Sequence, residues 1–177
     1  MNNIDQNGSS FGDQIQEGTR LLHQGKAQEA IPFLKQAVQM QPENVDAVIN
    51  LSGALILDRQ FRQAIAILEP FKDLPSNNAM LWINLGAAYL GNPVLARESD
   101  QKSAIEAFER ALEIDPLAPS VAYNIGLVYE DRKEFMESVF WFGKAVQANP
   151  HDEHAQRKIK RLEGLINSND DVPGTNG

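Results

Sequence analysis

A repeat with a period of 34 residues constrains this chain more than any other feature of its sequence. Small residues mark the period, with steps of 34, 34 and 40 residues between Gly18, Ser52, Gly86 and Gly126. A second series has steps of 34, 40 and 34 residues between Ala30, Ala64, Ala104 and Ser138. The two series lie 12 residues apart in three units and 18 apart in the third, which indicates a six-residue insertion there. A repeat of this length predicts stacked copies of one small supersecondary unit.

Each unit has the pattern of two helices. Apolar residues recur three and four positions apart, as in Ala30, Leu34 and Val38, whereas strands would need alternation. Residues that break a helix separate the two halves, at Gly25, 58–60 and 131–133. Prolines then close the units, because proline cannot continue a helix; they are Pro42, Pro75, Pro116 and Pro150. The predicted pairs are 11–24 with 27–40, 45–58 with 61–72, 79–91 with 101–114, and 119–132 with 135–148.

The insertion falls within residues 91–100, where glycine, proline and polar residues gather. It either lengthens the third helical pair or forms a protruding loop with the charged residues Arg97, Glu98, Asp100 and Lys102. Such a loop would make a partner-specific contact. Neutral sequence variation in a surface segment that tolerates insertions explains the insertion equally well.

A ninth helix is predicted over residues 152–167, after Pro150. One stripe of this helix is apolar, with Ala155, Ile159, Leu162 and Leu165, and charged residues fill the remainder. The helix would therefore cap the exposed edge of the last pair. Repeats over 11–44, 45–78, 79–118 and 119–152, together with this cap, are predicted to form a single domain over residues 11–167. The polar segments 1–10 and 168–177 are predicted to be disordered tails.

The residues of the units resemble the tetratricopeptide repeat (TPR) family. The third unit carries Trp82-x-x-Leu85-Gly86-x-x-Tyr89, followed by Ala104-x-x-x-Phe108, Ala111 and Pro116. The fourth unit has Ile125-Gly126-x-x-Tyr129, Phe142, Ala145 and Pro150. The second unit departs from the pattern at Phe71 and Pro75, which predicts a local deviation in packing. The resemblance spans residues 11–152 and implies an all-α fold: a right-handed superhelical α-solenoid of four helical hairpins plus a C-terminal capping helix.

An asparagine stands two places before the small residue in three successive units, at Asn50, Asn84 and Asn124. In the family this offset faces the concave inner wall and holds the backbone of a bound peptide. An amide suits that role because it offers donors and an acceptor to an extended chain. The alternative is that asparagine is a solvent-facing filler here. The other members of the implied peptide-binding groove are Ile49, Met80, Ile83, Ala87, Tyr123, Leu127 and Lys158.

The residues around the asparagine row are more apolar than a solvated groove requires, and contact with adjacent helices explains part of them.

TPR proteins that clamp the C-terminal carboxylate of a chaperone tail need a cation beside the asparagine. The matching positions of the first three units hold none; they are Ile15, Thr19, Asn50, Met80 and Asn84. The last units offer His154 and Lys158 after Asn124, but Ile83 and Ala87 replace other polar members. Binding of a chaperone tail is therefore disfavoured.

An aromatic run, Phe140-Trp141-Phe142, lies in the fourth unit. Phe142 matches a core position of the repeat. Phe140 and Trp141 are expected to pack against neighbouring helices. If exposed, they would mark a second, convex interaction surface.

Composition excludes several classes of function. The net charge of −8, from 16 Lys and Arg against 24 Asp and Glu, disfavours binding to nucleic acid and to anionic membrane surfaces. The absence of cysteine excludes disulfides and thiolate zinc sites. No segment approaches the roughly 20 apolar residues of a membrane span, and the N-terminus has no signal-peptide pattern. A cytoplasmic location is therefore expected.

Neither catalytic residues nor cofactors are predicted, because no phosphate-binding loop, G-x-S-x-G or H-E-x-x-H motif occurs. His151 and His154 are ligand types, but they lie at a helix start where neighbouring acidic residues are ordinary caps, so no metal site is predicted. The predicted function is a non-catalytic adaptor that binds a peptide segment or helix of a partner protein in the concave groove. The alternative is a structural scaffold or assembly factor that self-associates into a homo-oligomer through Phe140, Trp141 or the first unit, which matches the repeat pattern less well than the others.

Overall fold

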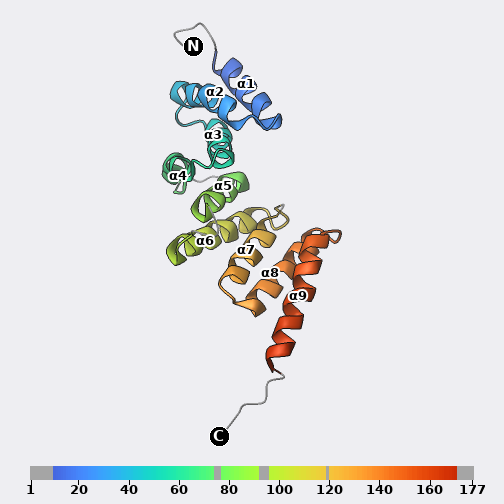
Figure 1. Cartoon of the computed structure of the whole chain (residues 1–177). Coiled ribbons are helices and arrows are strands. Elements are labelled where there is room, and N and C mark those ends of the chain that lie inside the picture. Colours follow the sequence, from blue (N-terminus) through green and yellow to red (C-terminus); the bar gives the residue numbers. More distant parts are fainter. Residues whose placement is uncertain (1–9, 74–76, 92–95, 119, 171–177) are drawn as a thin grey trace. The chain divides into compact units, whose positions relative to one another are not determined.

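All regular elements in the described part of the chain are helices (Figure 1), and the all-α prediction is confirmed. The computed structural model describes residues 10–73, 77–91, 96–118 and 120–170. The helices are α1 (Phe11–His23), α2 (Ala27–Met40), α3 (Val45–Leu57), α4 (Phe61–Leu68), η1 (Glu69–Phe71), α5 (Ala79–Leu90), α6 (Glu98–Ile114), α7 (Val121–Asp131), α8 (Phe135–Ala148) and α9 (Glu153–Asp170).

The ends of the chain depart slightly from the predicted tails. Ser10, which the sequence assigns to the N-terminal tail, is the N-cap of α1, and its hydroxyl oxygen accepts a hydrogen bond from the Asp13 backbone N–H. Helix α9 continues to Asp170, beyond the predicted end at residue 167. The remaining predicted tail residues, 1–9 and 171–177, lie outside the described residues.

Packing divides the chain into two compact units, Met1–Ala107 and Phe108–Gly177. The division falls inside α6, so the first unit holds α1 to α5 and the beginning of α6. The second unit holds the end of α6 together with α7, α8 and α9. The predicted single domain over residues 11–167 stays a prediction.

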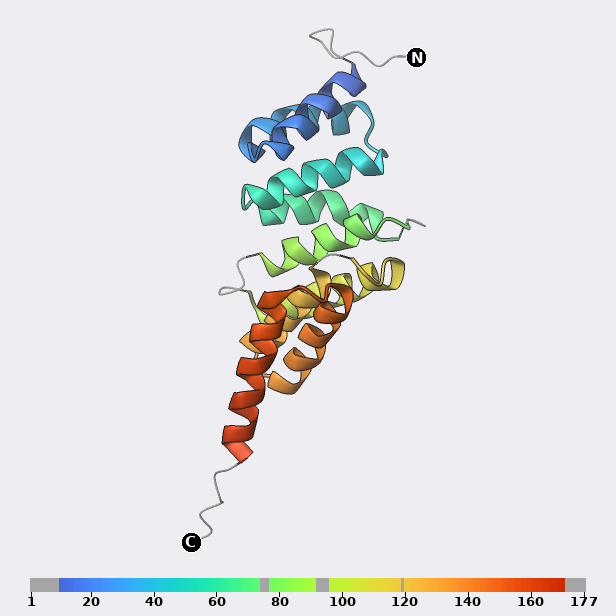
Figure 2. The ribbon, with the colours of Figure 1, turned by 90° about the vertical axis from the view of Figure 1, so that its right-hand side faces the viewer.

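Helical hairpins build the first unit, in which α1–α2 and α3–α4 are stacked on one another (Figure 2). A small residue permits the close approach of α1 and α2, because a Cβ atom at Gly18 would lie 2.5 Å from Cγ of Leu34. Leu34 is fully buried, and its core neighbours include Ala30, Leu51, Leu55 and Ala64. The small residue of the first hairpin therefore brings two helices together.

The hairpin α7–α8 of the second unit follows the same rule. A Cβ atom at Gly126 would lie 2.8 Å from Cδ1 of Phe142, whose ring is fully buried. Ser138, at the second small position, donates a hydrogen bond of 2.8 Å from its hydroxyl to the Gly126 carbonyl. Helix α9 packs against α8 and contributes Ala155 and Leu162 to this core. The predicted capping helix thus completes the second unit.

Three hairpin turns place a residue in the left-handed region of backbone space. Gly25, Arg59 and Lys133 each lie seven residues after the first small residue of their repeat, with φ angles of 73°, 61° and 60°. In each turn the following N–H donates to a carbonyl five residues earlier, which is the closing bond of a Schellman motif. Glycine adopts this conformation without strain, whereas the two other side chains do not.

Replacing Lys133 by glycine should therefore raise the free energy of unfolding by about 1 kcal/mol. The left-handed conformation costs an L-residue about 1–2 kcal/mol, and glycine removes this cost, but the greater entropy of glycine in the unfolded chain offsets part of the gain. Gly25→Ala should lower it by a similar amount. Urea denaturation followed by circular dichroism measures both changes. A lower urea midpoint for Lys133→Gly than for the unmodified chain would contradict this account of the turn.

The second repeat has an irregular second helix. Helix α4 ends at Leu68, before the predicted end at residue 72, and continues as the 3₁₀ helix η1. Pro70 explains the change, because it has no N–H to donate to the carbonyl four residues earlier. Phe71 is buried in a core cluster with Val48 and Leu81. Pro75 lies outside the described residues.

Polar side chains connect η1 to α5. The Tyr89 hydroxyl donates to the Glu69 carboxylate, and Lys72 forms a 3.6 Å ion pair with the same carboxylate. The Lys72 ammonium lies 5.9 Å from the centre of the Tyr89 ring. Burial raises the pKa of the Tyr89 phenol above its ordinary value, so the group stays protonated near neutral pH. These contacts fix the end of α5 against the second hairpin.

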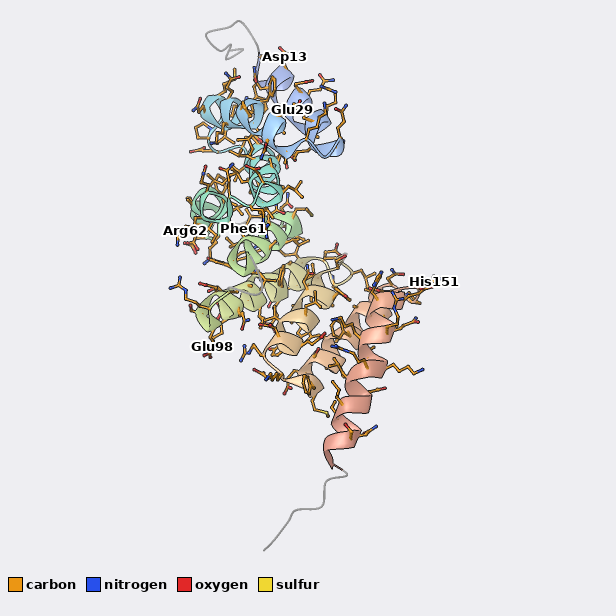
Figure 3. All side chains as sticks on the ribbon, in the orientation of Figure 1. Asp13, Glu29, Phe61, Arg62, Glu98 and His151 are labelled. Carbon is orange, nitrogen blue, oxygen red and sulfur yellow. The ribbon has the colours of Figure 1, made fainter. Side chains whose placement is uncertain are left out.

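The described part of the six-residue insertion contributes to a helix. Helix α6 begins at Glu98 (Figure 3), earlier than the predicted residue 101. Its first turns hold two of the predicted loop charges together, because Lys102 and Glu98 form a 2.8 Å ion pair. Arg97 pairs with Asp100 at 3.3 Å in the same way. The described part of the insertion therefore lengthens the third pair, while residues 92–95 lie outside the described residues.

Candidate functional site

Asn84 of the predicted row lies on α5, beside α3 in the first unit. Its Nδ2 donates to the Ile49 carbonyl at 3.1 Å and to the Ser52 hydroxyl at 2.9 Å. The Ser52 hydroxyl itself donates to the Ile49 carbonyl at 2.8 Å, and Asn84 is only 9% exposed. The amide donors of Asn84 therefore hold α5 against α3, and a peptide contact by Asn84 stays a prediction.

Asn50 occupies the same offset on α3 in a different environment. Its Nδ2 lies 3.4 Å from the Thr19 hydroxyl of α1, at the long end of hydrogen-bond geometry. The side chain is partly exposed. Because one weak bond holds it at a solvent-accessible place, a peptide contact by Asn50 stays a prediction.

Alanine substitutions of Asn84 and Asn50 should have different effects on the free energy of unfolding. Asn84→Ala should lower the free energy of unfolding by about 1–3 kcal/mol, because two hydrogen bonds are lost and the Ser52 hydroxyl loses its donor in a buried place. Asn50→Ala is the matched control and should change it by less than about 0.5 kcal/mol. Urea denaturation measures both values. Equal effects of the two substitutions would contradict the distinction between a buried and an accessible amide.

One face of α5 presents apolar side chains that a partner can reach. Met80 is 48% exposed, and Ile83 and Ala87 are partly exposed on the same face, three and seven residues further along. We call Met80, Ile83 and Ala87 the α5 face. Ile49 on α3 is partly buried and packs against the core cluster of Val48, Leu81 and Leu85, so it mainly supports this face.

The predicted site residues of α7 contribute to the core of the second unit. The Tyr123 ring centre lies 5.2 Å from that of Phe142, and Leu127 packs against the same cluster. Tyr123 also lines a hollow of about 280 Å³ together with Asn149 and Asp152. Asn124 is partly exposed. A peptide contact by these three residues stays a prediction.

Lys158, which the sequence assigns to the peptide-binding set, has a partner within the chain. Its ammonium forms hydrogen bonds of 3.0 and 2.8 Å to the two carboxylate oxygens of Glu130 on α7. Arg161 binds the same carboxylate, which is 17% exposed. The Lys158 ammonium also lies 6.0 Å from the Phe142 ring centre. Lys158 thus joins the cap α9 to α7, and its contact with a bound peptide stays a prediction.

The aromatic run also differs from expectation. Phe140 is 58% exposed, whereas it was expected to pack against neighbouring helices, and only Trp141 is partly buried. The two rings meet edge to face at 5.6 Å between centres. Met136 is 66% exposed on the same helix, and its spacing of four residues from Phe140 is the sequence signal that identifies a shared face.

The arrangement offers binding chemistry: amide groups and accessible apolar side chains on packed helices. Among the described residues, no three His, Cys, Asp or Glu side chains gather where they could hold a metal ion. His151 lies in the turn before α9 (Figure 3), and the neighbouring Asp152 accepts a capping hydrogen bond of 3.0 Å from the Ala155 backbone N–H. None of the helices in the described ranges combines the length and apolar character needed to cross a membrane.

Comparison with known proteins identifies the repeat. Two family profiles, both described as "Tetratricopeptide repeat", match residues 21–73 and 93–153. Together the two matches cover more than half of the 177 residues. The first match includes α2 to η1, and the second includes α6, α7 and α8.

Curated relatives align with the chain over a part of their own length. Protein O-mannosyl-transferase TMTC3 of Homo sapiens is 24% identical over 85% of this chain and 16% of that protein. Anaphase-promoting complex subunit 3 of Dictyostelium discoideum is 28% identical over 56% of this chain and 10% of that protein. Photosystem I assembly protein Ycf3 of Prochlorococcus marinus is 35% identical over 36% of this chain and 38% of that protein.

Solved structures share the fold. A crystal structure of MamA superimposes with a TM-score of 0.72 and 23% identity, covering 86% of each chain. A thermophilic TPR protein of Thermus thermophilus superimposes with a TM-score of 0.72 and 15% identity, covering 88% of this chain and 82% of that one. These likenesses establish the helical-repeat fold.

Proposed function

The chain belongs to the tetratricopeptide repeat family, and from that premise we propose that it is a non-catalytic adaptor that binds a segment of a partner protein. The α5 face carries the proposal. Met80 is half exposed there, and Ile83 and Ala87 are accessible beside it, on a helix that the second hairpin holds in place. Accessible apolar side chains on a rigid element favour association with a partner, because burying them releases water.

The chemistry of this face favours an apolar segment over a free carboxylate. A bound carboxylate needs a cation, and Lys158, which the sequence offers for that purpose, is already paired with Glu130. A partner segment would therefore place apolar side chains on the α5 face. The Asn50 amide on the neighbouring helix α3 would bond the backbone of that segment. Asn124, Tyr123 and Leu127 would serve the same purpose on the second unit.

The names of the relatives support a role in larger assemblies. One relative is a subunit of the anaphase-promoting complex, and another is an assembly protein of photosystem I. A third is named as a transferase, and this chain matches only 16% of its length. Assembly of a multiprotein complex is thus the process we propose for the adaptor. A cytoplasmic location stays a prediction of the sequence.

Site-specific photo-crosslinking in the source cell tests the proposal. A photo-reactive amino acid at position 80 should capture a partner protein, which mass spectrometry then identifies together with the attached segment. The matched control carries the same amino acid at position 62, where Arg62 is exposed on α4 (Figure 3). Capture at position 80 alone supports the α5 face. Capture at position 62 with none at position 80 would contradict it.

A further inference from the structure

Helix α8 presents a second apolar surface that the adaptor role leaves unused. Met136 is 66% exposed and Phe140 is 58% exposed, and the four-residue spacing puts them on one face of the helix. The opposite face of α8 holds the buried residues Ser138, Phe142 and Ala145. Two neighbouring large apolar side chains, each more than half exposed, indicate an interaction surface on a helix that is otherwise well packed.

A groove lies next to the exposed face that Met136 and Phe140 form, and it extends the apolar surface. Its volume is about 600 Å³, and its lining includes Leu112, Pro116, Leu117, Phe140, Trp141 and Lys144. Leu117 is 64% exposed at its rim. Because Phe140 belongs both to the exposed face with Met136 and to the groove, the two form one continuous apolar surface, which we call the α8 surface. All of its residues belong to the second compact unit.

The charges on the α8 surface are complementary to one another. Glu137 lies three residues before Phe140 and Lys144 lies four residues after it, and both are exposed. The Lys144 ammonium rests 5.6 Å from the centre of the Phe140 ring. Neither charge forms a salt bridge with another residue in the part of the chain that the structure covers. One acid and one base therefore stand before and after Phe140 along α8, three and four residues away from it.

We propose that the α8 surface binds a second copy of this chain, with the two α8 helices antiparallel across a two-fold axis near Phe140. Reversal of the helix direction exchanges the positions before and after Phe140, so Glu137 of each copy faces Lys144 of the other. The contact then has two equivalent ion pairs and a shared apolar centre, as a two-fold interface requires. Gly143 lies on the same face, and a Cβ atom there would have no neighbour within 4 Å, which leaves room for close approach of the partner helix.

The self-complementary charges favour a second copy over an unrelated partner. A different protein would need its own base opposite Glu137 and its own acid opposite Lys144 in the same register. A second copy supplies both at once. The net charge of −8 on each copy opposes association at long range, and salt screens this repulsion as well as the two ion pairs.

Sedimentation equilibrium of the full chain, over a concentration range from micromolar to millimolar, tests the proposal. We expect a monomer–dimer equilibrium. Glu137→Lys and Lys144→Glu should each raise the dimer dissociation constant at least tenfold, because each places like charges opposite one another. The double variant with both substitutions should restore the original value within about threefold. Lys35→Glu, at an exposed position on α2, is the matched charge control and should leave the constant unchanged.

Circular dichroism checks that each variant remains folded, and the exposure of all substituted residues makes this the expected result. A strict monomer over the whole range would overturn the proposal. A dimer that ignores both single substitutions would place the interface elsewhere, and failure of the double variant to restore dimerisation would overturn the antiparallel register. A monomer whose α8 surface binds an apolar peptide would assign the surface to another partner and would also overturn the proposal. Every outcome is independent of the α5 face, because Glu137 and Lys144 lie on α8 and the control Lys35 lies on α2.

Discussion

A chain that ends after Pro150 should lose the folded second unit. Helix α9 supplies Ala155 and Leu162, both fully buried, to the core around Phe142. A fully buried large apolar side chain contributes about 1.5–3 kcal/mol, and a whole domain is stable by only about 5–15 kcal/mol. The truncation also removes both cations that pair with Glu130. The remaining three helical segments of the unit are therefore expected to unfold.

Hydrogen exchange measured by mass spectrometry distinguishes the two units in this experiment. Amides of α7 and α8 should exchange rapidly in the truncated chain, whereas those of α3 in the first unit should keep their protection. A chain that ends after Asp170 keeps the whole of α9 and serves as the control, with protection unchanged. Full protection of α7 and α8 without α9 would contradict the role of the cap.

Replacement of Phe142 by alanine should lower the free energy of unfolding of the second unit by about 3–5 kcal/mol, because it empties a fully buried aromatic site. Gly126→Ala should lower it by about 1–3 kcal/mol, since the new methyl group would lie 2.8 Å from the Phe142 ring. With Phe142 already replaced, the methyl group has room, and the same glycine substitution should cost nothing or stabilise the helix. The two effects are therefore expected to be strongly non-additive.

Urea denaturation of the four chains in this double-mutant cycle measures the coupling. Gly164→Ala on α9 is the matched control, because a Cβ atom there has no neighbour within 4 Å. It should raise the stability by about 0.5–1 kcal/mol, the ordinary gain from alanine in a helix. Additive effects of Gly126→Ala and Phe142→Ala would contradict direct contact between the two positions.

The fold follows from the sequence to a large extent because its signals are local. The breaker at Gly25 ends α1 near the predicted residue, and the small residues at Gly18 and Gly126 identify where helices approach each other. The left-handed turns at Arg59 and Lys133 are harder to predict, since neither residue favours that conformation. Only the equal spacing from the small residue connects them with Gly25.

The site is less predictable because it depends on what each side chain meets on another helix. Asn50 and Asn84 share one offset in the repeat, yet Asn84 meets the Ser52 hydroxyl and is buried, whereas Asn50 has only a long contact to Thr19. The pairing of Lys158 with Glu130 joins residues 28 positions apart, which no local pattern indicates. Phe140 is likewise exposed because no helix covers it in the described part of the chain, and the periodicity of α8 alone does not predict whether another helix covers this residue.

The most direct test of the central claim is the affinity of the captured partner segment for the α5 face. Isothermal titration of a synthetic peptide with that sequence should give a dissociation constant that Met80→Asp raises at least tenfold, or about 1.4 kcal/mol. Met80 stands in the first turn of α5, where an acidic residue suits the helix dipole, so the helix itself should persist. Gln63→Asp, at an exposed position on α4, should leave the constant unchanged. Equal affinities of the Met80→Asp variant and the unmodified chain would contradict the claim that this face binds the partner.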